Sequence, residues 1–442
     1  DNKMTDETKE RVRRAGAQLE RSRGTISRRA LLTTVAGSSL LGAAGCVGRK
    51  ESPQVERGAE HDGADASDST LTPEPPRVGL GSDSFERLSD LEVTDGELYA
   101  NSERHVTGTQ CAELHTGADG SWLHIPLDEP MDFRDARPAC YVAIDGSAPG
   151  TYPYIDLQDR EGNRLRTRAV SRSHGALVRL DFGLLDPQVD DAPVDLAHIT
   201  RVSFRMAPGD ESGTEKLFLD CPVRVSAPET PKVAFMFDDG NETDYTKALP
   251  YLAQHDYPAI TYVNPSTIGT EGKLTESQLR ELQAEGWLVG SHTTDHLNLR
   301  ELSDPAEIEA QVRSAKQWLL ERGFTEGARH FAYPYGGVDE QALEIVSTVH
   351  DSGRVGGWQP IARPSNPQLV PGEGEPTPTE ARQLLDQTIA YGGVLSLFFH
   401  GLSTDAGLDE FQGVVDEVHR REQAGEIEVV RVDELVAAAE NG

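Results

Sequence analysis

The C-terminal half of the chain, from Pro231 onward, alternates short apolar runs with longer amphipathic segments, and this alternation constrains the fold more than any other feature. Short apolar runs bounded by turn residues are typical of buried parallel strands, whereas the segments between them have the period of helices. The sequence predicts strands over 233–237, 259–263, 287–290, 331–333, 394–399 and 427–430, and helices over 245–254, 275–285, 305–320, 338–349 and 379–390. About seven strand–helix units over residues 231–442 fit a parallel α/β barrel better than an open sheet.

Residues 80–227 have a different pattern, in which short alternating segments are separated by Gly, Pro and Asp turns without intervening helices. This pattern predicts an all-β sandwich or jelly roll as a separate accessory domain. Modules of this kind often bind glycans through exposed aromatic rings, for which the candidates here are Trp122, Tyr152 and Tyr154. Each ring is equally consistent with a place in the core, and a purely structural spacer is the alternative role for the domain.

The first 46 residues have the features of an export signal. Arg28 and Arg29 precede an apolar run, Ala30–Gly45, that is too short for a membrane span and ends at Cys46. The paired arginines resemble a twin-arginine signal and Ala-Gly-Cys resembles a lipobox, so Cys46 is expected to carry lipid and anchor the protein to the outer face of the cell membrane. An uncleaved weak anchor is the alternative. Residues 47–79 are acidic and nearly free of aromatics, which predicts a disordered linker.

The charge of the chain limits its partners. Asp and Glu number 74 against 42 Lys and Arg, of which only 8 are Lys, and the net charge is −32. Carboxylates spread over every segment are typical of proteins from extreme halophiles, because high salt screens their repulsion. An ordinary acidic extracellular protein is the alternative source. Either surface repels phosphate backbones, so no nucleic-acid partner is expected.

Three cysteines lie in the predicted sandwich, namely Cys111, Cys140 and Cys221. They allow at most one disulfide, which export would permit, and one thiol is left over. Three buried reduced cysteines are the alternative.

Three short segments that lie far apart in the chain carry the residues of a hydrolytic metal site: 237–240 (Phe-Asp-Asp-Gly), 291–296 (Ser-His-Thr-Thr-Asp-His) and 398–400 (Phe-Phe-His). A carboxylate and two imidazoles can hold a divalent cation and leave coordination positions open, while one Asp and one His remain to move protons. A parallel barrel would bring to one rim the polar residues that follow its strands, namely Asp238, Asp239, His292, Tyr335 and His400.

Four ordered motifs in this half resemble those of the polysaccharide deacetylases, the NodB-homology or carbohydrate esterase family four enzymes: Phe237-Asp238-Asp239-Gly240, His292-Thr293-Thr294-Asp295-His296, Tyr333-Pro334-Tyr335-Gly336 and Leu397-Phe398-Phe399-His400. The resemblance implies a distorted (β/α)7 barrel and metal-dependent removal of N-acetyl groups from a hexosamine polymer. By position it makes Asp238 the general base and His400 the general acid, and gives Tyr335 an oxyanion-binding backbone N–H. The metal ligands it implies are Asp239, His292 and His296.

The chain departs from the family pattern in three places, one of which is Phe398, where a Leu usually stands two positions before the His. The Arg that usually stands two positions before the motif's Pro, where it pairs with the base, is Ala332 here, and Arg329 lies on a different part of the strand. The motif that tunes the general acid is also missing. Its carboxylate partner is unassigned, with Asp405 and Asp409 as candidates by sequence proximity alone, and Trp358 is a candidate for the aromatic wall.

The expected function is that of a lipid-anchored polysaccharide N-deacetylase, a hydrolase that uses a metal-activated water as nucleophile on an N-acetylated surface glycan. The expected metal is zinc, with cobalt, nickel and manganese as alternatives. Other interpretations are a glycan-binding lipoprotein with an inactive barrel, another amide hydrolase on the same fold, and a non-haem iron oxygenase with the same ligand set.

Overall fold

The computed structural model describes residues 78–80, 85–117, 120–145, 152–171, 175–186, 189–190, 192–206, 215–357 and 359–437. The export signal with Cys46, nearly all of the linker, and Trp358 lie outside these residues, so what the sequence predicts for them stays a prediction. Within the described ranges, no helix combines the length and the apolar character that a membrane span requires.

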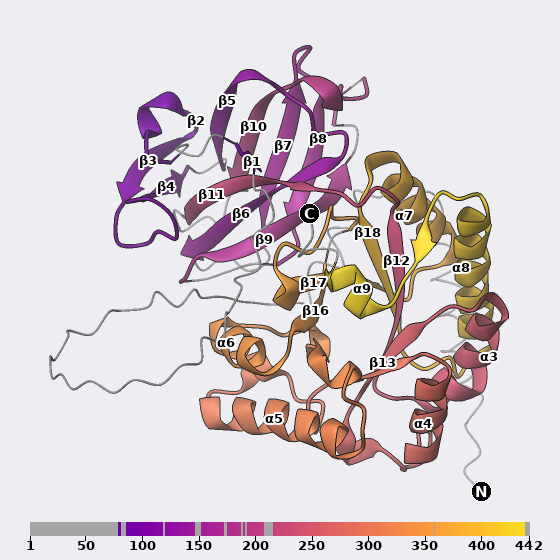
Figure 1. The fold of residues 1–442 in the computed structure, drawn as a ribbon. Helices are drawn as coiled ribbons and strands as arrows, with labels where there is room; N and C mark the ends of the chain where they lie inside the picture. The colour runs from indigo at the N-terminus through magenta and orange to yellow at the C-terminus, as the bar shows by residue number, and fades with distance from the viewer. Residues whose placement is uncertain are drawn as a thin grey trace, which may run out of the picture. The chain divides into compact units, whose positions relative to one another are not determined.

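The first part of the described chain is all-β and antiparallel (Figure 1). Its strands are Val78–Gly79 (β1), Glu92–Thr94 (β2), Gly96–Asn101 (β3), Cys111–Thr116 (β4), Ser121–Met131 (β5), Ala136–Asp145 (β6), Pro153–Asp159 (β7), Arg164–Ala169 (β8), Val178–Asp186 (β9), Ile199–Met206 (β10) and Lys216–Ser226 (β11). They pair in the order β2-β5-β10-β7-β8-β9-β6-β11-β4-β3, with β1 added to β11. The prediction of an all-β region before the barrel is therefore confirmed, and β1 shows that strand structure begins inside the segment expected to be linker.

Buried and partly exposed residues alternate in β8 and in the first half of β5, whereas β6 is buried along most of its length. Leu123 in β5, Ile155 in β7 and Phe204 in β10 are fully buried, whereas their sequence neighbours Trp122 and Tyr154 keep part of their surface exposed. This alternation follows from the two-residue period of a strand with one face against the core. Trp122 and Tyr154 thus belong to the outer face of the sheet and not to its core.

The three cysteines of the all-β region are reduced. Cys111 and Cys140 are fully buried, Cys221 is half-buried, and all three are free. Burial raises the pKa of the Cys111 thiol to about 12, so this group stays protonated at neutral pH. Of the two alternatives for these cysteines, the structure has the one without a disulfide.

The C-terminal part is a closed parallel barrel. Its strands are Lys232–Asp238 (β12), Ala259–Val263 (β13), Leu288–Ser291 (β14), His330–Ala332 (β15), Ser352–Gly356 (β16), Val370–Gly374 (β17) and Val394–Phe399 (β18). They pair in sequence order and the ring closes where β12 pairs with both β18 and β13, while the short strand Glu428–Val429 (β19) is added to β12. Six of the seven residues of β12 are buried, as expected for a strand covered on both faces. The predicted seven-stranded barrel is confirmed.

Helices connect the barrel strands, as Figure 1 shows. They are Leu249–Leu252 (α3), Glu276–Ala284 (α4), Pro305–Glu321 (α5), Glu340–Val349 (α6), Pro378–Tyr391 (α7), Asp405–Gln423 (α8) and Val432–Ala437 (α9). Capping boxes fix the starts of α4 and α7, through Thr275 with Gln278 and Thr377 with Glu380. The helix expected over 245–254 is present as a continuous helical run, which begins with a π-helical turn, Asp244–Ala248, continues as α3 and ends with a 3-10 turn, Ala253–His255.

Two barrel strands, β16 and β17, do not appear among the strands expected from the sequence. Their sequences, Ser-Gly-Arg-Val-Gly and Val-Pro-Gly-Glu-Gly, contain too few apolar residues to form a recognisable strand pattern. A residue of β16 and the residue that directly follows β17 belong to the site described below.

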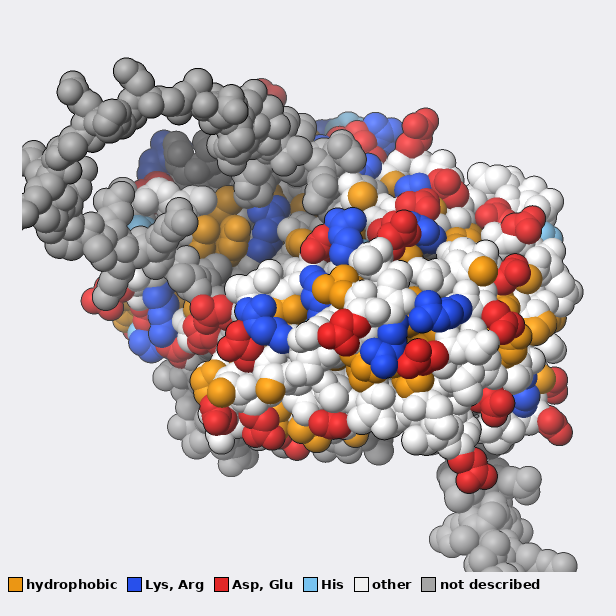
Figure 2. Space-filling model, turned by 60° about the horizontal axis from the view of Figure 1, so that its bottom comes forward, with side chains coloured by type: hydrophobic (Ala, Val, Ile, Leu, Met, Phe, Trp, Pro, Cys, Tyr) orange, Lys and Arg blue, Asp and Glu red, His pale blue; other side chains and the backbone are white. Residues whose placement is uncertain are grey.

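Acidic residues are distributed over the molecule. On the face shown in Figure 2, acidic and basic side chains are interspersed, and the acidic side chains do not gather in one place. This distribution agrees with the spread of carboxylates along the sequence.

Candidate active site

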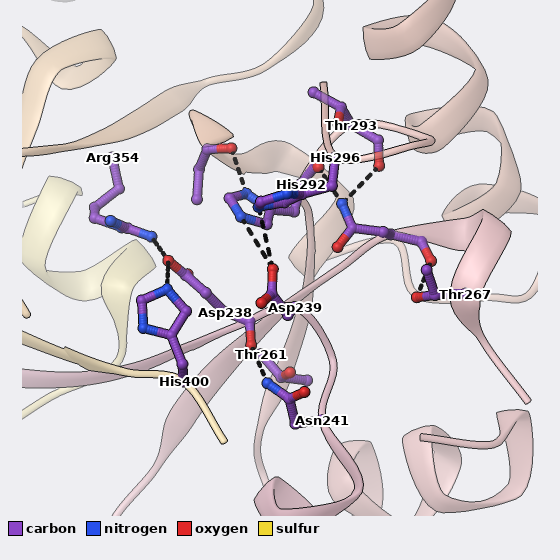
Figure 3. A network of polar contacts seen from close by, with 12 residues as sticks. Asp238, Asp239, Asn241, Thr261, Thr267, His292, Thr293, His296, Arg354 and His400 are labelled. Carbon is purple, nitrogen blue, oxygen red and sulfur yellow. Dashed lines mark hydrogen bonds and ion pairs between the residues drawn. The ribbon is translucent and has the colours of Figure 1, made fainter. Parts of the chain in front are cut away.

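The barrel brings the candidate residues to one rim, as its topology requires. Asp238 is the last residue of β12 and His292 follows β14. His400 follows β18, and Tyr335 lies in the turn after β15. Figure 3 shows Asp238, Asp239, His292, His296 and His400 converging on one point from these strand ends.

Asp239, His292 and His296 form a group that can hold a metal ion. Their nearest ligand atoms all lie within 4.8 Å of one another. Oδ1 of Asp239 is 3.2 Å from Nε2 of His296 and 3.7 Å from Nε2 of His292. The same carboxylate oxygen is buried and has no hydrogen-bond partner among the described residues. An unpartnered buried carboxylate oxygen facing two imidazole nitrogens indicates a cation between them.

The tautomer of His292 supports this interpretation. Its Nδ1 lies 2.7 Å from the carbonyl oxygen of Ala332, which can only accept, so Nδ1 carries the proton. Burial lowers the pKa of His292 to about 4, so the ring is neutral at neutral pH and its Nε2 holds a bare lone pair. A lone pair and a carboxylate oxygen repel each other unless a cation lies between them, and the donor set fits zinc or a similar divalent ion.

The backbone around these ligands is held in an uncommon conformation. Asp239, Thr293, His296 and Tyr335 have φ values of 73°, 64°, 59° and 59°, in the left-handed region that residues with a Cβ rarely adopt. The side-chain amide of Asn264 donates hydrogen bonds to the carbonyl oxygens of His292 and Thr293 and so fixes this turn. Such strain typically gathers where geometry is needed for function.

Asp238 is paired with a residue that the sequence did not indicate. Its side chain is buried, and its Oδ2 accepts a hydrogen bond from Nη2 of Arg354 in β16. The guanidinium of Arg354 lies 4.1 Å from the ring centre of Phe398, so that its position is fixed by packing as well as by charge.

The position of Arg354 corrects the expectation that the base has lost its Arg partner. In the pairing of β15 with β16, Arg354 is the direct neighbour of Ala332, the residue at the family's usual Arg position. The cation is therefore supplied from the adjacent strand, whereas Arg329 forms an exposed ion pair with Asp351. The signal in the sequence was only an Arg between glycines in a segment without a strand pattern.

His400 also has a partner that the sequence did not indicate. Its Nε2 lies 3.9 Å from Oδ2 of Asp238, and its Nδ1 lies 3.2 Å from Oε1 of Glu375, which directly follows β17. The structure thus gives the histidine a carboxylate partner in Glu375, in place of the candidates Asp405 and Asp409. A carboxylate on Nδ1 fixes this nitrogen as the donor and leaves Nε2 to face the site.

Tyr335 lies beside the metal ligands. Its side chain is among the most exposed large ones in the described chain, at 73%, and its ring centre is 4.7 Å from that of His296. The exposed ring borders the candidate metal position and can contact a ligand that enters the rim. The expected contribution of its backbone N–H to oxyanion binding stays a prediction.

Loss of either histidine ligand is expected to remove the metal. Three protein ligands leave little redundancy, so His292→Ala and His296→Ala should each lose most of the bound divalent metal after dialysis, as measured by elemental analysis. His255→Ala, which changes a half-buried histidine outside the site, should keep it. Full metal content in both site variants would show that these residues are not the ligands.

Part of the barrel is similar to proteins of a known family. Residues 226–350 match the profile of the polysaccharide deacetylase family. A chitooligosaccharide deacetylase of Azorhizobium caulinodans is 34% identical over 116 residues, which are 26% of this chain and 52% of that protein. A poly-beta-1,6-N-acetyl-D-glucosamine N-deacetylase of Staphylococcus aureus is 26% identical over 123 residues, 25% of this chain and 42% of that protein.

The chain thus spans about half, or less, of the length of these curated relatives. Among solved structures, a family 4 carbohydrate esterase from Streptomyces lividans in complex with acetate has a TM-score of 0.34 and 14% identity, over 46% of this chain and 92% of that one. This likeness is too low to add to the argument. Residues 226–350, with Asp238 and the three candidate metal ligands among them, match the polysaccharide deacetylase family.

Proposed function

We propose that this protein is a metal-dependent hydrolase that removes N-acetyl groups from an extracellular or cell-surface polysaccharide. The observation that carries the proposal is the position of a buried, Arg-paired Asp238 between the candidate metal ligands and His400. The names of the curated relatives, which are deacetylases of chitooligosaccharides and of an N-acetylglucosamine polymer, support the same reaction.

The proposed chemistry follows from the needs of an acetamide, which is a poor electrophile with a poor leaving group. A divalent cation held by Asp239, His292 and His296 would polarise the amide oxygen and lower the pKa of a water. Asp238 is suited to accept the proton of that water, because Arg354 occupies Oδ2 while Oδ1 is buried without a hydrogen-bond partner among the described residues.

His400 is suited to the second proton transfer. Glu375 holds its Nδ1, so that a proton on Nε2 points toward Asp238 and the substrate position. Delivery of this proton to the departing nitrogen turns an amide anion into an amine, which is the form that can leave. Each of the two unligated groups thus has one task, Asp238 as base and His400 as acid.

Acetate release tests the proposal directly. The metal-loaded protein should release acetate from at least one N-acetylated polymer in a panel that includes chitooligosaccharides and poly-N-acetylglucosamine, and chelation should abolish the release. O-acetylated polymers in the same panel distinguish an amide hydrolase from an esterase. Metal binding without acetate release from any N-acetylated polymer would overturn the proposal and favour a glycan-binding barrel without turnover.

The charge of Glu375, which faces Nδ1 of His400, can be tested separately from the shape of its side chain. Glu375→Gln should lower turnover several-fold to about tenfold without changing metal content, because a neutral hydrogen bond to His400 replaces a charge-assisted one. Asp405→Asn, at the start of α8, is the matched control and should retain parental turnover. If Asp405→Asn is impaired and Glu375→Gln is not, the assignment of the acid's partner is wrong.

We also propose that the protein is exported and anchored to the outer face of the membrane through lipid on Cys46, where its polymer substrate would be found. The support is the sequence of the first 46 residues alone. Unchanged detergent partitioning of Cys46→Ser would contradict it.

A further inference from the structure

The outer face of the all-β region carries a row of aromatic and arginine side chains that are brought together only by strand pairing. Trp122 of β5 is the direct neighbour of Arg205 of β10, Arg205 is the neighbour of Tyr154 of β7, and Tyr154 is the neighbour of Arg168 of β8. Figure 1 shows β5, β10, β7 and β8 side by side in this order. Aromatic and guanidinium groups thus alternate across four strands.

The row lies on the outer face and not in the core. The neighbours of these residues along each strand, such as Leu123, Phe204 and Ile155, are fully buried on the other face of the sheet. All four members of the row are half-buried. Side chains on one face of neighbouring strands are separated by about 4.8 Å. The row therefore forms a continuous, partly exposed strip.

The rings hold the guanidinium groups in place. Arg205 lies 5.1 Å from the ring centre of Trp122, and Arg166, which neighbours the row on β8, lies 5.6 Å from the same ring. Arg168 lies 4.1 Å from the ring centre of Tyr152 and 5.8 Å from that of Tyr154. Stacking on aromatic rings is a contact that arginine makes without using up its N–H donors.

The face has an excess of positive charge in a chain whose net charge is −32. Five arginines share it, namely Arg164, Arg166, Arg168, Arg201 and Arg205. Three carboxylates form ion pairs with them: Asp156 with Arg164 and Arg166, Asp190 with Arg164, and Glu92 with Arg201. Arg205 differs from these, since no ion pair is formed by it within the described residues and its Nε is buried there without a hydrogen-bond partner. A guanidinium group that is held in place with a donor lacking an acceptor is suited to bind an oxyanion of a ligand.

We propose that this arginine–aromatic face, defined by Trp122, Tyr154, Arg166, Arg168 and Arg205, binds an anionic glycan. The carboxylate or sulfate groups of the glycan would accept hydrogen bonds from the guanidinium groups, and its sugar rings would lie along the aromatic side chains. Arg205 and Arg168 stand two strands apart, about 9.6 Å, which is comparable with the length of a disaccharide repeat. This spacing favours a polymer that carries a negative group on every second sugar.

The choice of a glycan over another polyanion rests on the proposed function of the barrel, which acts on a polysaccharide. The binding itself does not require turnover, so the two proposals can fail separately. A face that holds the polymer would also keep the chain at its substrate between successive reactions, through the effective concentration that a second contact creates.

The test is direct binding by the full chain, measured by calorimetry in salt at which the protein is folded. A uronic-acid polymer, a sulfated polymer, a neutral polymer and single-stranded DNA are compared. Arg205→Gln should weaken binding of the charged polymer about tenfold or more, since a charge-assisted hydrogen bond is worth at least that factor. Arg134→Gln, which removes the same charge from an exposed loop, should not. Whether the uronic-acid or the sulfated polymer binds more tightly identifies the anionic group.

Arg205→Lys distinguishes recognition by the planar guanidinium group from recognition by charge alone, because lysine keeps the positive charge but has no planar group that stacks on a ring. Its binding should stay weakened. Parental unfolding midpoints and parental acetate release in these variants would show that fold and barrel are intact. Equal binding of the parental protein to neutral and charged polymers, tighter binding of DNA than of either charged glycan, or unchanged binding by Arg205→Gln would each overturn the proposal.

Discussion

Replacing Asp238 with Asn is expected to reduce acetate release by roughly 10²–10⁴-fold or more while the bound metal is retained. The amide keeps the shape of the side chain and can still accept a hydrogen bond from Arg354, so the packing of the buried pair changes little. What it removes is the ability to take a proton from water. Turnover with the metal-loaded variant, together with elemental analysis of the same sample, measures the two effects separately.

Asp156→Asn is a matched control for this variant. Asp156 is also a buried Asp with an arginine partner, Arg166, but it lies in the all-β region and not in the barrel. Its replacement should leave turnover unchanged. If Asp238→Asn releases acetate at the parental rate, Asp238 is not the base, and the mechanism proposed here must be reassigned.

Replacing Arg354 with Met is expected to shift the acidic limb of the pH–rate profile to higher pH. Burial acts to raise the pKa of Asp238, but the charge and the hydrogen bond of Arg354 outweigh it and hold the pKa below the ordinary value. Without Arg354 the effect of burial dominates, and Asp238 takes up a proton at a higher pH. A protonated Asp238 cannot act as a base, so activity is lost at pH values where the parental protein is active.

The same variant should be less stable, by about 3–5 kcal/mol, because it leaves a buried charge without its partner. A carboxylate with a lowered pKa stabilises the folded state above the ordinary pKa of Asp, and this contribution disappears as the pH falls through the lower folded-state value. The difference in the free energy of unfolding between the parental protein and Arg354→Met should therefore be largest at neutral pH and should become smaller in acid. Urea unfolding at several pH values measures it.

The strand pairing offers a sharper control for Arg354. Because Ala332 is its direct neighbour on β15, the double variant Ala332→Arg/Arg354→Ala moves the cation by one strand to the position that the family usually uses. This variant should recover part of the turnover and part of the acidic activity that Arg354→Met loses. A parental pH profile in Arg354→Met would show that Arg354 does not set the pKa of the base.

The sequence could indicate the candidate metal ligands and the two candidate proton-transfer residues because they follow strands with strong apolar patterns. Val394–Phe399, for example, is an unbroken apolar run but for one Ser, and His400 is the polar residue that ends it. In a parallel barrel, such residues must meet at one rim. The position of these groups is therefore encoded locally, by where each strand stops.

The partners of these residues were not predictable in the same way. Arg354 belongs to β16 and Glu375 directly follows β17, and both strands are rich in glycine and resemble loops in the sequence. That Arg354 stands beside Ala332 depends on the register between two strands separated by a helix, which no local pattern specifies. The sequence offered Trp122 and Tyr154 as candidate glycan-contacting rings, but their arrangement with Arg205 and Arg168 depends on strand pairing in the same way.

The hydrogen bond between His292 and Ala332 also affects the local stability of the barrel. Strands β13 and β14 share four paired residues, whereas β14 and β15 share only one, Ser291 with Phe331. His292 directly follows β14, and its imidazole hydrogen-bonds to the carbonyl oxygen of Ala332 in β15, which adds a contact between these two strands. This candidate metal ligand thus also holds β14 against β15, and we expect a divalent ion bound by its imidazole to raise the free energy of local opening between these strands.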